Sequence, residues 1–190
     1  MKIEIIEIEI KKILSPKRYE HSLRVADKMK ELAEIYHLDV EIASIIGLVH
    51  DIAKEMTDEE LINYTTENKI EIDYTEKLKP TLLHGKVGAD IACKKWNITP
   101  EMKDAIIYHT TGKKEMSTLG KILFIADKIE DGRKNINPEL QTLAKTNLDV
   151  TLKYLYTQII QKSLQKDSIL HLLTIEARNE LIKMQKEKTS

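Results

Sequence analysis

Hydrophobic residues recur every three or four positions along most of the chain, which is the spacing of one buried face of an α-helix. Caps indicate where several of these helices begin. Ser15 precedes Pro16 and Thr99 precedes Pro100, and in each pair a capping side chain is followed by a proline suited to the first helical position. The pattern therefore predicts an all-α fold.

Residues 3–10 are the one ambiguous segment. Alternation of isoleucine with glutamate, interrupted only at Ile5-Ile6, favours a strand, whereas the Glu content and the flanking lysines tolerate a helix, and we interpret the segment as a helix. The other helices are expected at 16–35, from Asp39 to Val49, from Thr57 onward, from about Leu82 to Trp96, from Pro100 to near Gly112, from Ser117 through Asp127, at 149–160 and at 168–184.

The length and composition are typical of one globular domain. We expect a single domain over residues 1–190, with its core over about residues 15–180. The 30 basic and 31 acidic residues nearly cancel, so the sequence predicts no binding to nucleic acid polymers or to membranes. Cys93 is the only cysteine and no signal peptide is visible, which favours a cytoplasmic location.

Four of the six histidines lie at or near helical positions flanked by apolar residues, namely His21, His50, His84 and His109. One such histidine alone is usually structural, and we interpret His37 and His171 in that way. The four histidines together are a stronger indication of a metal site, because Asp51 follows His50 at the end of an apolar helix. Asp127 ends an apolar run, where an unpaired carboxylate would cost several kcal/mol. A bound metal ion would satisfy all of these groups.

Imidazole and carboxylate ligands together favour transition metals such as iron, manganese, zinc or nickel. Four histidines and two aspartates suffice for two ions, and Asp51 can bridge them through its two oxygens. Two ions so placed activate a bridging hydroxide and stabilise the attacking and leaving oxygens of a displacement at phosphorus.

The order of these residues resembles the HD-domain metal-dependent phosphohydrolases, whose fold is a helical bundle. The local sequence narrows the resemblance to the YqeK-type bacterial proteins. The matching segments are Arg18-Tyr19-Glu20-His21-Ser22, His50-Asp51-Ile52-Ala53-Lys54, His84-Gly85-Lys86-Val87-Gly88-Ala89, Tyr108-His109-Thr110-Thr111-Gly112, Ala126-Asp127-Lys128-Ile129-Glu130-Asp131-Gly132-Arg133 and Thr174-Ile175-Glu176-Ala177-Arg178-Asn179.

The resemblance implies a symmetrical diadenosine tetraphosphate hydrolase with a di-iron centre, which releases two ADP molecules. It implies that His21, His50, Asp51 and Asp127 surround one ion, and that Asp51, His84 and His109 surround the other. Asp51, as the bridging ligand, and Lys54 are the expected catalytic residues.

A tetraphosphate bridge carries roughly four negative charges, so its cleavage calls for cations around the substrate. Each candidate could equally be a solvated surface residue, and its place in the matched segments is what favours it. The predicted substrate-binding residues are Arg18, Arg24, Lys54, Thr110, Arg133 and Arg178. We expect Lys86 and Lys128 to point to solvent.

Two alternative functions are consistent with the same residues. An HD-type nucleotidase or cyclic-nucleotide phosphodiesterase would keep the site and change the substrate, and product analysis separates it from a tetraphosphatase. A catalytically silent nucleotide-binding regulatory module would bind no transition metal. The base preference and the oligomeric state, including a homodimer, are left open by the residues.

Overall fold

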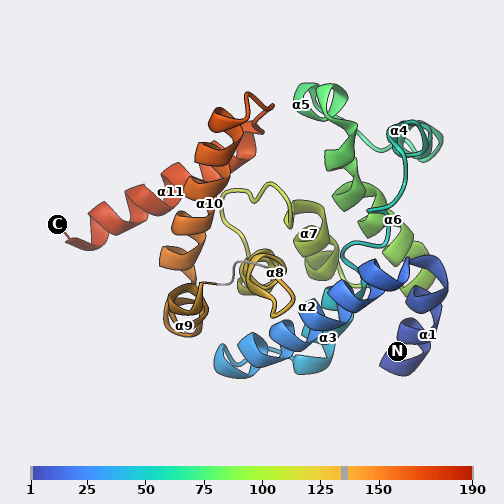
Figure 1. Cartoon of the computed structure of the whole chain (residues 1–190), viewed down its shortest axis with the longest axis horizontal. Coiled ribbons are helices and arrows are strands. Elements are labelled where there is room, and N and C mark those ends of the chain that lie inside the picture. The colour runs from blue at the N-terminus through green and yellow to red at the C-terminus, as the bar shows by residue number, and fades with distance from the viewer. Residues whose placement is uncertain (1, 134–136, 190) are drawn as a thin grey trace.

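The computed structural model describes residues 2–133 and 137–189, and within these ranges the regular structure is entirely helical (Figure 1). The predicted all-α fold is confirmed. The helices are α1 (Ile3–Ile13), α2 (Pro16–Ile35), α3 (Val40–Val49), α4 (Asp58–Glu67), α5 (Tyr74–Leu78), the 3-10 helix η1 (Pro80–Leu83), α6 (His84–Trp96), α7 (Pro100–Tyr108), α8 (Thr118–Ile129), α9 (Pro138–Thr146), α10 (Leu148–Gln165) and α11 (Leu172–Thr189).

The predicted caps are present where the helices begin. Ser15, Asp39, Thr99 and Ser117 each accept a hydrogen bond from a backbone N–H in the first turn of the following helix. Thr57 forms a reciprocal capping box with the glutamate three residues later. These local contacts explain why the sequence pattern locates the starts of the helices correctly.

Several boundaries differ from the predicted ones. The helix that carries residues 106 and 107 ends at Tyr108, and the next three residues form a turn. The last helix begins at Leu172, four residues later than expected. Helices α5 and α9 were not predicted. Helix α5 has only five residues, whereas α9 begins with the cap-plus-proline pair Asn137-Pro138, which sequence reasoning overlooked. The ambiguous opening segment is a helix that buries Ile6 and Ile10.

Helices α2 and α3 pack against each other at very short range, and this contact sets the position of the chain after α3. A Cβ atom added to Gly47 of α3 would lie 2.6 Å from the Cα atom of Ala26 in α2. Seven consecutive residues of α3, from Ala43 to Val49, are buried. The helix therefore delivers the two residues that follow it, His50 and Asp51, into the interior.

Helix α8 lies near the centre of the bundle, with α2 and α3 on one side and α7 and α10 packed against it elsewhere (Figure 1). The main cluster of buried hydrophobic residues extends from Ile6 in α1 to Leu181 in α11. The single domain over residues 1–190 stays a prediction. Among the described residues, none of the helices combines the length and apolarity required to cross a bilayer.

We predict that Gly47→Ala lowers the free energy of unfolding of the metal-free protein by about 1–3 kcal/mol, although alanine favours helices by about 1 kcal/mol relative to glycine. The cause is the collision of the new methyl group with the α2 backbone. Chemical denaturation followed by circular dichroism measures the change.

Gly88→Ala in α6 is the matched control. The nearest atom to its added Cβ is Ile52 Cγ2 at 3.4 Å, which is an ordinary contact. This variant should be stabilised by about 0.5–1 kcal/mol. Equal effects of the two substitutions would show that the α2–α3 contact does not limit stability.

Candidate metal centre

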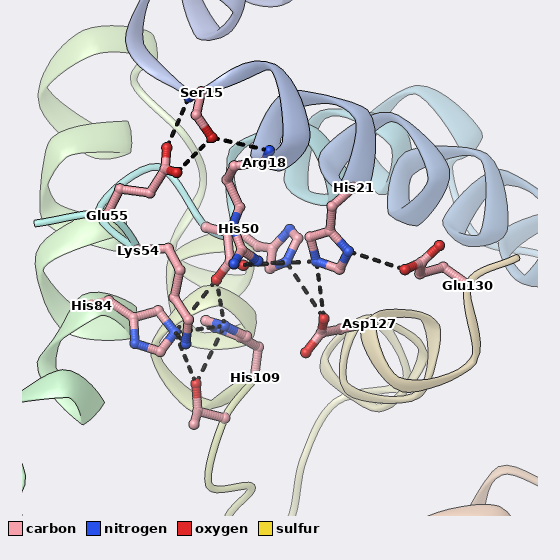
Figure 2. Close-up of polar contacts among 12 residues, drawn as sticks. Ser15, Arg18, His21, His50, Lys54, Glu55, His84, His109, Asp127 and Glu130 are labelled. Atoms are coloured by element: carbon pink, nitrogen blue, oxygen red, sulfur yellow. Dashed lines mark hydrogen bonds and ion pairs between the residues drawn. The ribbon is translucent and has the colours of Figure 1, made fainter. Parts of the chain in front are cut away.

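Five helices bring the six predicted metal ligands together in the interior. Figure 2 labels five of them, namely His21, His50, His84, His109 and Asp127. His21 lies in α2, His84 begins α6 and Asp127 lies near the end of α8, while His50, Asp51 and His109 follow the ends of α3 and α7. All six are buried, with exposed fractions of 0–8%. The structure therefore gathers residues that are up to 106 positions apart in the sequence, from 21 to 127.

Three of the histidine rings are oriented by the same local hydrogen bond. The Nδ1 atoms of His50, His84 and His109 lie 2.7, 2.5 and 2.7 Å from the carbonyl oxygens of the residues three positions earlier. A carbonyl oxygen can only accept, so Nδ1 is the protonated nitrogen of each neutral ring. The Nε2 lone pair is left free to bind a metal ion.

Asp51 lies between these rings and faces all four histidines. Its Oδ1 atom is 3.4 Å from Nε2 of His84 and 3.4 Å from Nε2 of His109. Its Oδ2 atom is 3.6 Å from Nε2 of His50 and 3.7 Å from Nε2 of His21. Each carboxylate oxygen therefore faces a different pair of imidazoles, as a bridging ligand requires.

Asp127 completes the end of the cluster that contains His21. Its Oδ1 atom is 3.2 Å from Nε2 of His21 and 4.0 Å from Nε2 of His50. The donor atoms of His21, His50 and Asp127 lie within 4.8 Å of one another, and so do those of His50, Asp51 and His109. Either set is compact enough to hold an ion.

The six ligand side chains fit a divalent cation because the atoms that face one another are hydrogen-bond acceptors with free lone pairs. The Nε2 atoms of His84 and His109 are 3.2 Å apart, although each carries a lone pair in the tautomer set by its Nδ1 contact. The buried Nε2 atoms of His21 and His50 make no hydrogen bond of good geometry. Buried polar atoms without partners are rare and costly, and a bound cation would remove the cost.

Burial keeps His50 and His84 in the neutral form that binds metal. It lowers the pKa of His50 from 6.5 to about 4, and it also lowers the pKa of His84. Burial alone would raise the pKa of Asp127, but the ammonium group of Lys128 and the imidazoles of His21 and His50 together outweigh it and hold that pKa well below its usual value. At neutral pH the centre therefore presents the neutral imidazoles of His50 and His84 beside an ionised Asp127 carboxylate.

Cationic side chains surround the ligands. Arg18 Nη1 is 2.7 Å from Asp51 Oδ2, Arg133 Nη2 is 2.8 Å from Asp127 Oδ1, and Lys54 Nζ is 3.2 Å from His84 Nε2. Lys54 is exposed as a whole residue, yet burial of its amino group at the cluster lowers its pKa. Three of the predicted substrate-binding cations therefore contact the cluster.

Thr110 is the fourth predicted substrate-binding residue at the cluster. Its hydroxyl lies 3.2 Å from His84 Nε2 and 3.3 Å from His109 Nε2. The other two are engaged elsewhere. Arg24 Nε donates to Glu130 at 2.7 Å, and Arg178 Nε donates to Thr157 at 2.8 Å, a contact that joins α10 and α11.

Two predictions about lysines were wrong. Lys128 was expected in solvent, but its amino group lies 2.5 Å from Asp127 Oδ2. Lys86 was also expected in solvent, and it donates to Glu76 Oε2 at 2.6 Å and to the carbonyl of Glu71 at 2.8 Å. Long flexible side chains reach partners that helical spacing alone does not reveal.

Sequence reasoning missed Glu130. This residue is only 2% exposed, and its Oε1 atom lies 3.2 Å from Nδ1 of His21 (Figure 2). Its position three residues after Asp127, in the same matched segment, was the available signal. His171 was interpreted as structural; it is buried at the start of α11, outside this cluster, and its Nε2 lies 2.8 Å from Asp73 Oδ2.

Comparison with known proteins identifies the family of this chain. The family model of the HD domain matches residues 18–132. The symmetrical bis(5'-nucleosyl)-tetraphosphatase of Staphylococcus aureus is 33% identical, and the match covers 94% of each chain. The Bacillus subtilis protein of the same name is also 33% identical, over 75% of this chain and 77% of its own.

A solved structure extends the similarity to the fold. It is a Clostridium acetobutylicum protein described as a predicted HD superfamily hydrolase involved in NAD metabolism. The TM-score is 0.92 at 39% identity, and the match covers 97% of this chain and 98% of the other. This chain therefore belongs to the HD-domain family and, within it, to the group of the symmetrical bis(5'-nucleosyl)-tetraphosphatases.

Proposed function

We propose that this protein hydrolyses diadenosine tetraphosphate symmetrically into two ADP molecules, with the help of two divalent transition-metal ions. The observation that carries the proposal is the placement of Asp51, whose two oxygens each face a pair of histidine Nε2 atoms at 3.4–3.7 Å. The relatives named as symmetrical tetraphosphatases support the choice of substrate.

The residues that would hold the ions divide into two sets that share one member. His21, His50, Asp51 and Asp127 would hold one ion, and Asp51, His84 and His109 would hold the other. The mixture of imidazole and carboxylate donors suits iron, which we favour, and also manganese, zinc or nickel. When bound, such ions activate water and offset charge on the phosphates.

The reaction adds one water molecule across the central phosphoanhydride of the substrate. A water oxygen bonds to one of the two inner phosphorus atoms, and the bond from that atom to the central bridging oxygen breaks. One ADP retains the bridging oxygen, and the other acquires the oxygen of water. The net change is one water consumed, two ADP formed and, with the terminal phosphate of each ADP fully ionised, two protons released to solvent.

The side chains around the ligands have distinct roles in this proposal. Lys54 and Thr110 lie at the side of His84 and would contact the phosphate chain there. Arg18 and Arg133 lie at the side of Asp51 Oδ2 and Asp127 and would offset the charge of the departing ADP. Cations on both sides suit a substrate whose charge continues on both sides of the bond that breaks.

We also infer that the enzyme acts on free nucleotides in the cytoplasm. The single cysteine and the near balance of 30 basic and 31 acidic residues support this inference. Binding of a small, strongly anionic nucleotide requires cations at the binding site, and the cluster has them. It does not require a positive net charge on the whole protein.

Turnover of diadenosine tetraphosphate by the iron-loaded protein, with chromatography of the products, tests the function. We expect ADP as the only nucleotide product. In water enriched in oxygen-18, half of the ADP molecules should carry one labelled oxygen on the terminal phosphate. AMP with ATP as products, or turnover of nucleoside monophosphates alone, would contradict the proposal.

We predict that Asp51→Asn reduces kcat/KM for diadenosine tetraphosphate by about 100-fold or more, because an amide can neither bridge two cations nor balance their charge. Metal analysis of the purified variant should show less than the wild-type metal content. Asp104→Asn is the matched control, since Asp104 pairs with Lys113 at the surface. Wild-type activity in the Asp51 variant would rule out the bridging role.

We predict that Lys54→Met lowers kcat by about 10- to 100-fold while the metal content stays at the wild-type level. The reason is that a charged hydrogen bond to phosphate contributes about 1.5–3 kcal/mol. Steady-state kinetics and metal analysis on the same preparation measure both quantities. Lys113→Met provides the control at the surface, and a metal-depleted Lys54 variant would instead assign Lys54 to the stability of the centre.

A further inference from the structure

His21 differs from the other three histidines of the cluster in the partner of its Nδ1 atom. His50, His84 and His109 each face a neutral backbone carbonyl from their own turn. The Nδ1 atom of His21 instead lies 3.2 Å from Oε1 of Glu130, a residue that follows the end of α8. Its ring is therefore oriented by a charged group from a distant part of the chain.

Glu130 is held rigidly in this position. Its Oε2 atom accepts hydrogen bonds from Arg24 Nε at 2.7 Å and from the backbone N–H of Gly132 at 2.6 Å. Its Oε1 atom faces His21 and also lies 3.5 Å from Arg133 Nε. A Cβ atom at Gly132 would collide with Arg24 Nε, so a larger residue there would displace the guanidinium from Glu130.

The network excludes a direct role for Glu130 with substrate. The side chain is buried, both of its oxygens have partners, and its negative charge would repel phosphate. A carboxylate that accepts a hydrogen bond from a ligating histidine does something else, because it fixes the ring and makes the other nitrogen a stronger donor.

We propose that Glu130 is a positioning residue that strengthens binding of the ion held by His21, and that Arg24 acts through Glu130 instead of contacting substrate. The inference rests on the metal centre of the proposed function. It predicts that the two ions bind with unequal affinity, since within residues 2–133 and 137–189 a carboxylate faces the Nδ1 atom of His21 but of none of the other three histidine ligands.

Glu130→Gln tests the proposal because the amide retains the size of the side chain and can still accept from Nδ1, while the charge is lost. Titration of the metal-free protein with Co²⁺, followed by its visible absorption and by competition with a chelator, measures each affinity. We expect one of the two Co²⁺ equivalents to bind about 10- to 100-fold more weakly. The visible band of that equivalent should shift, which a purely structural role would not cause.

Glu31→Gln is the matched control. Glu31 lies on the same helix as His21 and pairs with Lys28 and Lys145, away from the cluster. This variant should bind Co²⁺ with wild-type affinity. Arg24→Lys is the second test variant, since it keeps the charge but loses the Nε–H donor, and it should weaken the same equivalent by a smaller factor.

Wild-type Co²⁺ affinity in both the Glu130 and Arg24 variants would overturn the proposal, as would a wild-type protein that binds no Co²⁺. If the Glu130 variant does not fold, the Arg24 variant decides alone. A wild-type protein that binds two Co²⁺ ions but leaves diadenosine tetraphosphate intact would overturn the proposed function and leave the role of Glu130 standing.

Discussion

The site depends on one electrostatic arrangement, in which unprotonated imidazole nitrogens surround a single buried carboxylate. Asp51 is 3% exposed, and four histidine Nε2 atoms face its two oxygens. Such an arrangement is costly in a protein interior unless a cation occupies it. The close packing of α2 against α3 at Gly47 places the Asp51 carboxylate where this cost, and its relief by metal, are both large.

The chemistry of the site follows from a contrast between local and global charge. The whole chain has a formal net charge of −1, yet Arg18, Lys54, Lys128 and Arg133 all contact ligand-type residues of the cluster. Four of the 30 basic residues therefore lie at the cluster, where the proposed substrate would bring its phosphates. These cations, together with the membership of the HD-domain family, connect the fold to hydrolysis of a highly charged nucleotide.

Sequence reasoning located what local rules determine. Capping residues such as Ser15 and Thr99 fix the starts of helices within a few residues, and the order of the histidines and aspartates identified the family. It failed for contacts that depend on how distant segments meet. The partners of Lys86 and Lys128, and the contact between Glu130 and His21, join side chains whose directions spacing cannot determine. Helix α5, with five residues, is too short for periodicity to reveal.

The role of Asp51 as a shared ligand is tested most directly by a crystal structure of the iron-loaded protein with data collected on both sides of the iron absorption edge. A bridging Asp51 predicts two anomalous peaks, both within bonding distance of its carboxylate, one beside His21 and Asp127 and the other beside His84 and His109. A single peak, or two peaks that do not share Asp51, in a preparation that is fully active on diadenosine tetraphosphate would contradict this role.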